Sequence, residues 1–169
     1  NLFADARGSA SYGLLLKAIS DSRIEKNTFR SNSVALHLEE ASRNQITGNR
    51  FERNGWALRL LANSDDNRVT GNSFIANSFD VGASGDQHST KMSGNYWDAY
   101  RGYDLNRDGV GDVPHHPVRL FALVVEHNPP VLLLLRSFLL DVLDLAERVL
   151  PVLTPASVVD TAPKIRPPG

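Results

Sequence analysis

Apolar residues recur in short alternating runs along the first hundred positions of the chain. The triplet Asn-x-aromatic marks each repeat, at steps of 22, 23 and 23 residues, as Asn27-Thr28-Phe29, Asn49-Arg50-Phe51, Asn72-Ser73-Phe74 and Asn95-Tyr96-Trp97. Residues at equivalent positions of successive repeats fall into four apolar columns, Leu14/Leu36/Leu58/Val81, Leu16/Leu38/Leu60/Ala83, Ile24/Ile46/Val69/Met92 and Phe29/Phe51/Phe74/Trp97. The hydrophobic pattern therefore belongs to a repeat protein.

A period of this length with short alternating strands is typical of one turn of a parallel β-helix, whose turns stack about 4.8 Å apart. We predict an all-β fold, a right-handed parallel β-helix of the kind found in pectin lyases. Asn suits the corners because it tolerates a left-handed backbone and its amide can bond to the neighbouring turns. A leucine-rich repeat has a similar period, but it needs several Leu around its Asn, and a single alternating pair does not supply them.

The composition changes along the chain and divides it into four parts. Residues 1–97 form the coils, 98–130 an acidic and aromatic region that closes their end, 131–150 an amphipathic helix, and 151–169 an extended Pro-rich tail. Asn1 lies 26 residues before Asn27, so we expect an additional loop around Asp5 to Ser11 in the first coil. Because the sequence opens in mid-coil, we expect more coils and a signal peptide to precede it in the natural protein.

Composition narrows the class of protein further. The chain has 169 residues, 41% of them hydrophobic, which is enough for a folded core. The formal net charge of −1 gives no electrostatic reason to expect a nucleic-acid partner. The absence of cysteine excludes disulfides, thiolate metal sites and thiol catalysis. Apolar runs such as Val131 to Leu135 are too short to span a membrane, which takes about 20 residues.

An acidic loop follows the repeats and matches the first part of a calcium-binding loop. In that comparison the ligands at positions 1, 3, 5, 7 and 9 are Asp104, Asn106, Asp108, the carbonyl of Val110 and Asp112. Position 12 departs from the pattern, because His115 stands where the bidentate Glu belongs. The two interpretations are a shortened calcium site and a plain Asp/Asn/Gly-rich turn without an ion.

The histidines give little support to a transition-metal site. His115 and His116 are adjacent, and neighbouring residues of an extended strand point to opposite faces, so they do not chelate one ion easily. His37, His88 and His127 are scattered along the chain, whereas copper and zinc sites need clustered His, Met or Cys ligands.

The Leu-rich segment 131–150 carries more apolar residues than one core-facing stripe of a helix requires. Leu133, Phe138 and Leu140 lie outside the main stripe and are candidate partner-binding residues. Two interpretations remain open, a helix that packs on the coils and on a partner, and a helix buried on two sides within this chain. The prolines after it should keep the tail extended, on the surface or along a partner.

The segment NYWDAYRGYDLNRDGVGDVP, from Asn95 to Pro114, resembles the N-x-W-x-x-Y-x-G-Y-D-x-[ND]-x-D-G-[IV]-G-D-x-P segment of the NosD family. The resemblance continues in Leu143 to Leu153 and in Val159-Asp160. It implies a periplasmic β-helix protein that works with the membrane subunit of an ABC transporter, with a copper chaperone and with nitrous oxide reductase, whose copper centres they assemble. The implied association with copper has no residues assigned to it, and His115-His116 departs from the family's aromatic pattern.

Two other functions fit a β-helix, a carbohydrate-active enzyme and a calcium-dependent surface protein. Enzymes that cleave polysaccharides need carboxylates that converge on a groove. The outward position between two core columns carries Leu15, His37, Arg59 and Gly82, which do not form an acidic column. We therefore expect a protein without enzymatic activity.

Overall fold

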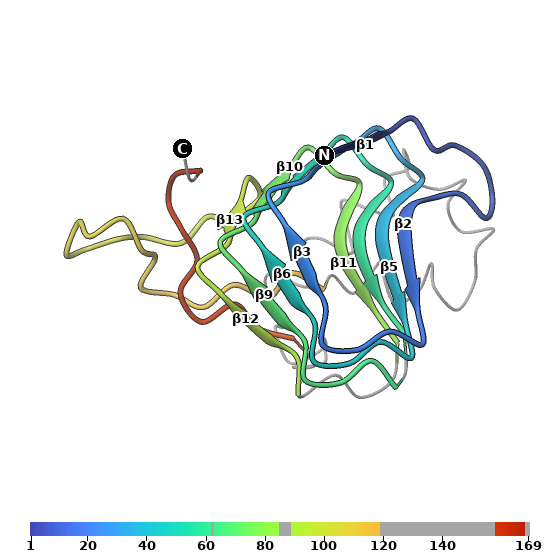
Figure 1. Ribbon diagram of the computed structural model, residues 1–169. Helices are drawn as coiled ribbons and strands as arrows, with labels where there is room; N and C mark the ends of the chain where they lie inside the picture. The colour runs from blue at the N-terminus through green and yellow to red at the C-terminus, as the bar shows by residue number, and fades with distance from the viewer. Residues whose placement is uncertain (62, 85–88, 119–157, 168–169) are drawn as a thin grey trace.

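A computed structural model describes residues 1–61, 63–84, 89–118 and 158–167 of the chain (Figure 1). The described residues form strands and loops without a helix. The strands are β1 (Leu2–Ala4), β2 (Tyr12–Lys17), β3 (Arg23–Glu25), β4 (Thr28–Arg30), β5 (Val34–Glu39), β6 (Gln45–Thr47), β7 (Arg50–Glu52), β8 (Trp56–Leu60), β9 (Arg68–Thr70), β10 (Ser73–Ile75), β11 (Phe79–Ala83), β12 (Lys91–Ser93) and β13 (Tyr96–Trp97). The predicted all-β fold is confirmed.

Each coil contributes one strand to each of three parallel sheets, so neighbours in a sheet are three strands apart in the chain. The sheets have the orders β1-β4-β7-β10-β13, β11-β8-β5-β2 and β12-β9-β6-β3. In Figure 1 the strands β3, β6, β9 and β12 run side by side, and β2, β5 and β11 form a neighbouring wall. The arrangement is a parallel β-helix of about four coils, with strand β1 before them.

The strand register confirms the four apolar columns. Leu36 pairs with Leu58 and Leu58 with Val81, and all three side chains are fully buried. The aromatic column stacks ring on ring, with centroids 5.0 Å apart for Phe29–Phe51, 4.9 Å for Phe51–Phe74 and 4.1 Å for Phe74–Trp97. Phe3 extends it, because its ring lies 4.9 Å from that of Phe29. The loop expected around Asp5 to Ser11 lies between β1 and β2.

Asparagine ladders connect the coils from within. The backbone N–H of Asn27 donates to Oδ1 of Asn49 at 2.9 Å, and its Nδ2 donates to the same oxygen at 3.1 Å. Asn49 repeats this pattern toward Asn72, and Asn72 repeats it toward Asn95. The amides therefore satisfy buried backbone groups at each corner, as predicted.

The left-handed backbone falls on a different residue from the one expected. It belongs to the residue before each ladder Asn, such as Lys26 (φ 53°), Gly48 (φ 64°) and Ser31 (φ 57°), and not to the Asn itself. The chain turns at this preceding position, and the Asn side chain then lies inside the coil, where its amide reaches the next Asn.

A further ladder, not anticipated from the sequence, lies at the corner between the second and third sheets. The N–H of Ser22 donates to Oδ1 of Asn44 at 3.0 Å, and the N–H of Asn44 donates to Oδ1 of Asn67 at 3.0 Å. No aromatic residue follows these Asn two positions later, so the Asn-x-aromatic signature misses them.

The described part of the Pro-rich tail pairs with the last coil. Asp160 forms a parallel bridge with Met92 and an antiparallel bridge with His115, and Lys164 bridges Tyr96. Asp160 is fully buried, so at this point the tail packs against the last coil of its own chain. The helix expected over 131–150 lies outside the described residues.

Asp160 ends the first asparagine ladder. Its Oδ2 accepts from the N–H of Asn95 at 3.1 Å, from Nδ2 of Asn95 at 2.8 Å and from Nε1 of Trp97 at 3.0 Å. Its Oδ1 accepts from the N–H of Ala162 at 3.1 Å. The carboxylate thus occupies the acceptor position that an Asn fills in every earlier coil.

Candidate functional site

The acidic loop brings three of its five predicted ligands into direct contact. Oδ1 and Oδ2 of Asp104 accept from the N–H groups of Asp108 (3.2 Å) and Gly109 (2.9 Å). Nδ2 of Asn106 donates to Oδ2 of Asp108 at 3.0 Å, and Oδ1 of Asp108 accepts from the N–H of Val110 at 2.8 Å. The loop is a self-contained network of Asx turns.

The other two predicted ligands, Val110 and Asp112, make different contacts. Oδ2 of Asp112 accepts from the N–H of Leu105 at 2.7 Å, and Val110 forms an antiparallel bridge with Lys164. In the part of the chain that the structure describes, no group of three or more His, Cys, Asp or Glu side chains is placed to hold a metal ion. The carboxylates are therefore hydrogen-bond acceptors for the backbone, and calcium at this loop stays a prediction.

Tyr100 fixes the acidic loop against the end of the last coil. Its hydroxyl donates to the carbonyl of Val113 at 2.7 Å, and burial raises the pKa of this phenol. A Cβ atom at Gly102 or Gly111 would collide with the Tyr100 side chain, so both positions require glycine for the ring to fit. His115 lies against the rings of Trp97 and Tyr100, with centroids 5.0 Å and 5.6 Å away.

The histidines of the described residues do not converge. His115 is half-buried under these rings, whereas the adjacent His116 is exposed. His37 is 3% exposed and lies on β5, in the second coil. His88, His127 and the candidate partner-binding residues Leu133, Phe138 and Leu140 lie outside the described residues.

Aromatic side chains gather on the outer side of the sheet β11-β8-β5-β2. We call this the aromatic face, and it comprises Tyr12, His37, Trp56, Arg59, Phe79 and Gly82. The rings of Trp56 and Phe79 stack with centroids 4.3 Å apart, and those of Tyr12 and His37 lie 4.7 Å apart. The guanidinium of Arg59 lies 5.4 Å from the Trp56 ring, a cation–π contact. Burial, and next the charge of Arg59, lower the pKa of His37.

The outer side of the sheet β12-β9-β6-β3 is exposed and cationic. We call this the basic face, and it comprises Arg23, Arg43, Gln45, Arg68 and Lys91. A depression of about 310 Å³ lies on it, lined by Arg43, Gln45, Asp66, Arg68, Ser89 and Lys91. Neither face was recognised as a site in the sequence. The basic face could have been found from the residues directly before the column Ile24/Ile46/Val69/Met92, which read Arg23/Gln45/Arg68/Lys91.

The chain matches known proteins over most of its length. A family model described as "Periplasmic copper-binding protein (NosD)" matches residues 1–102. A protein of Pseudomonas aeruginosa named "Probable ABC transporter binding protein NosD" is 34% identical over 148 residues, covering 87% of this chain and 30% of that protein. A protein of the same name from Stutzerimonas stutzeri is 34% identical over 146 residues, covering 86% of this chain and 29% of that protein.

The chain thus spans about 30% of the length of these curated relatives. The family model covers the coil repeat of residues 1–97 and the first residues of the segment Asn95 to Pro114 on which the resemblance was based. Among the described residues there is no helix that could cross a membrane. The family model covers more than half of the chain, so the chain belongs to the NosD family.

Proposed function

We propose that this chain is part of a non-enzymatic periplasmic accessory protein in the assembly of the copper centres of nitrous oxide reductase. Its partners would be the membrane subunit of an ABC transporter, a copper chaperone and the reductase itself. Family membership carries the proposal: the family is described as periplasmic and copper-binding, and two relatives are named as ABC transporter binding proteins.

The fold supports a docking role. A β-helix holds its coils in register through the core columns and the asparagine ladders, which leaves the outward positions of three sheets free to carry contacts. Rigid sheet faces of this kind present side chains at fixed spacing without a conformational change. A scaffold that positions a chaperone and a reductase near a transporter needs such surfaces and no catalytic group.

The described residues do not fit a copper site of their own. The chain has no cysteine, Met92 is buried in the core, and no group of three or more His, Cys, Asp or Glu side chains in the described part is placed to hold a metal. Copper sites need clustered soft ligands. In this part of the chain we therefore assign the copper-related role to protein contacts.

A polysaccharide-cleaving enzyme is less well supported. The depression on the basic face has a single carboxylate, Asp66, among its lining residues. Glycosidases place two carboxyl groups on opposite sides of the scissile bond. A calcium-dependent surface protein depends on the acidic loop, whose carboxylates bind backbone N–H groups in the structure.

Co-purification of the full-length protein with the transporter tests the proposal. We expect the parent protein to retain the transporter's membrane subunit, and Leu133→Asp or Phe138→Asp to weaken this association if those residues face the partner. Leu15→Asp is the matched control, because Leu15 is an exposed leucine on the coils. Failure of the parent protein to bind the transporter, the chaperone and the reductase would contradict the proposed function.

A further inference from the structure

The basic face is built in strict register across adjacent coils. Arg23 pairs with Gln45, Gln45 with Arg68, and Arg68 with Lys91, and all four side chains are exposed. Their neighbours in each strand, from Ile24 to Met92, point into the core, so the alternation of the strands directs these four outward. The result is a straight row of polar side chains with two cations side by side at one end.

Arg68 and Lys91 line the depression together with one carboxylate, that of Asp66. Like charges on residues that lie opposite each other on neighbouring strands repel each other and destabilise the sheet. Some other cations on the coils form ion pairs, such as Lys17–Glu39 (2.8 Å), Arg43–Asp21 (2.7 Å) and Arg50–Glu52 (3.0 Å). Neither Arg68 nor Lys91 forms an ion pair with any residue in the described ranges, although both line the same depression.

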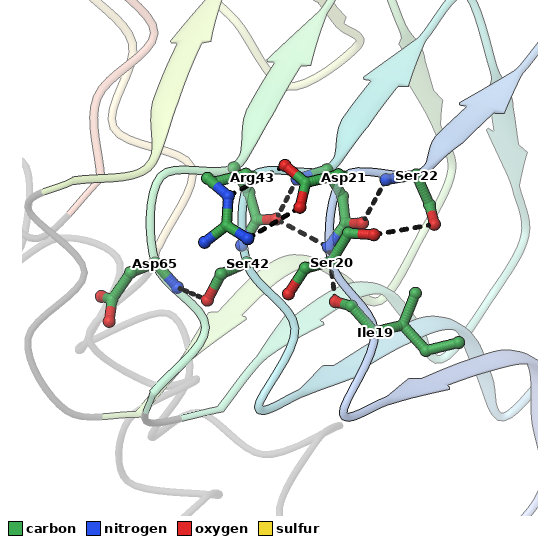
Figure 2. A network of polar contacts seen from close by, with 9 residues as sticks. Ile19, Ser20, Asp21, Ser22, Ser42, Arg43 and Asp65 are labelled. Atoms are coloured by element: carbon green, nitrogen blue, oxygen red, sulfur yellow. Dashed lines mark hydrogen bonds and ion pairs between the residues drawn. The ribbon is translucent and has the colours of Figure 1, made fainter.

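The corner beside these cations is fixed by its own polar network (Figure 2). Arg43 donates through Nε and Nη2 to the two carboxylate oxygens of Asp21, at 2.9 Å and 2.7 Å. The N–H of Asp65 donates to Oγ of Ser42 at 3.2 Å. Further along the same corner, Oγ of Ser89 accepts from the N–H of Asp66 at 3.0 Å and donates to Oδ1 of Asp65 at 3.2 Å. The wall of the depression is thus preorganised, and Arg68 and Lys91 remain to bind an anion.

We propose that the depression binds an acidic side chain of a protein partner, with Arg68 and Lys91 as the groups that contact its carboxylate. Arginine and lysine recognise carboxylates through charge-assisted hydrogen bonds, and a bound carboxylate relieves the repulsion between them. The basic face has no aromatic ring on which a base or a sugar could stack, and no large exposed apolar side chain among its strands to enter a lipid bilayer.

The identity of the partner rests on the proposed function, whereas the surface itself is tested without it. The probe is a capped tetraglutamate peptide, titrated by NMR into the whole chain at low salt, with tetraglutamine as the neutral reference. We expect the double variant Arg68→Glu/Lys91→Glu to bind tetraglutamate at least fivefold more weakly than the parent. Lys26→Glu/Arg30→Glu is the matched control. It makes the same charge change at an exposed lysine and arginine outside the depression, and it should stay within twofold of the parent.

A second readout separates recognition from a structural role. Lys91→Gln should raise the thermal stability slightly at low salt, because it removes a like-charge contact, while it weakens peptide binding. Equal peptide binding by the double variant and the control would overturn the proposal, as would a parent that does not bind the peptide. Binding of the parent to phosphatidylglycerol vesicles through Arg68 and Lys91, without binding to the peptide, would also overturn it and assign the face to a membrane. If the peptide binds as expected but the full-length protein binds none of the three proposed proteins, only the proposed function fails.

Discussion

The aromatic face and the basic face share one backbone and one core, yet they differ in almost every other respect. On the aromatic face His37 is 3% exposed and Phe79 5%, and two ring contacts, Tyr12–His37 and Trp56–Phe79, each join neighbouring coils. On the basic face the corresponding outward residues are exposed, and the three cations among them, Arg23, Arg68 and Lys91, form no ion pair with any described residue. The strands of both faces pair in parallel with the same one-coil step.

This difference separates what the repeat requires from what it leaves free. The inward columns and the ladder amides recur in each coil because every coil must bury the same positions and satisfy the same backbone groups. The outward positions do not have to meet these requirements, so one sheet carries stacked rings and another carries a row of cations. Function in this protein is therefore to be sought in the outward residues, coil by coil.

Both faces depend on the shared core. A substitution that disrupts the core should therefore unfold both of them. Leu58→Asp places a carboxylate in a fully buried column and should cost roughly 3–5 kcal/mol of unfolding free energy. Leu15→Asp is the control, since Leu15 is 42% exposed and faces outward in the first coil. Urea denaturation measures both, and similar losses for the two variants would contradict the assigned register.

Substitutions on the aromatic face should destabilise the protein more than substitutions on the basic face. A Cβ atom at Gly82 would lie 2.6 Å from the Trp56 ring, so Gly82→Ala should displace the ring and cost about 1–3 kcal/mol. Gln45→Ala on the basic face should change stability by less than about 0.5 kcal/mol. Differential scanning calorimetry compares the two, and a neutral Gly82→Ala would show that the rings do not pack on this position.

Acid should weaken the aromatic face selectively. Burial lowers the pKa of His37 from 6.5, so at falling pH the unfolded chain takes up the proton before the folded chain does. Stability is therefore complete above about pH 6.5 and falls below it, by up to about 1.4 kcal/mol for each pH unit until the folded-state pKa is reached. His37→Gln should remove this part of the decline in urea titrations between pH 7.5 and 5.5, and Lys91→Gln should leave it unchanged. If the free energy of unfolding depended on pH identically in the parent and in His37→Gln, His37 would not be the source of the decline.

The acidic loop offers a third kind of surface, and its response to calcium should be the smallest effect. With an affinity of about 1 mM, as in weak extracellular calcium sites, 1 mM calcium adds roughly 0.4 kcal/mol, or about 1 °C in melting temperature. Asp108→Ala should abolish the shift, while Asp5→Ala, an exposed carboxylate in another loop, should preserve it. No shift in the parent protein would favour the plain turn.

The coils could be predicted because their residues repeat at nearly constant spacing. Contacts between residues far apart in the sequence could not be predicted. The columns through Leu58 and Phe51 could be predicted because each repeats at nearly constant spacing. The ladder through Asn44 and Asn67 has only two asparagines and no accompanying aromatic residue. Asp160 lies 65 residues from Asn95, so no local pattern connects them.

The candidate sites were harder to predict than the fold. The Asp/Asn/Gly pattern predicts the acidic loop, but it does not distinguish carboxylates that bind a cation from those that bind backbone N–H groups. The basic face is a property of neighbouring coils. Arg68 and Lys91 are 23 residues apart in the sequence, and they become one site only once the register is known.

The hydrogen bonds of the asparagine ladder all run in one direction. The side chain of its last member, Asp160, accepts hydrogen bonds but has no N–H group with which to donate one. An amide accepts with its oxygen and donates with its nitrogen, so each Asn transmits the pattern to the coil that follows. A carboxylate only accepts, and Asp160 uses both oxygens on donors from Asn95, Trp97 and Ala162. Asp160 therefore ends the ladder, because its side chain could not donate a hydrogen bond to a further coil stacked on it. A single oxygen-for-nitrogen exchange, Asp160→Asn, would restore that donor at the end of the solenoid.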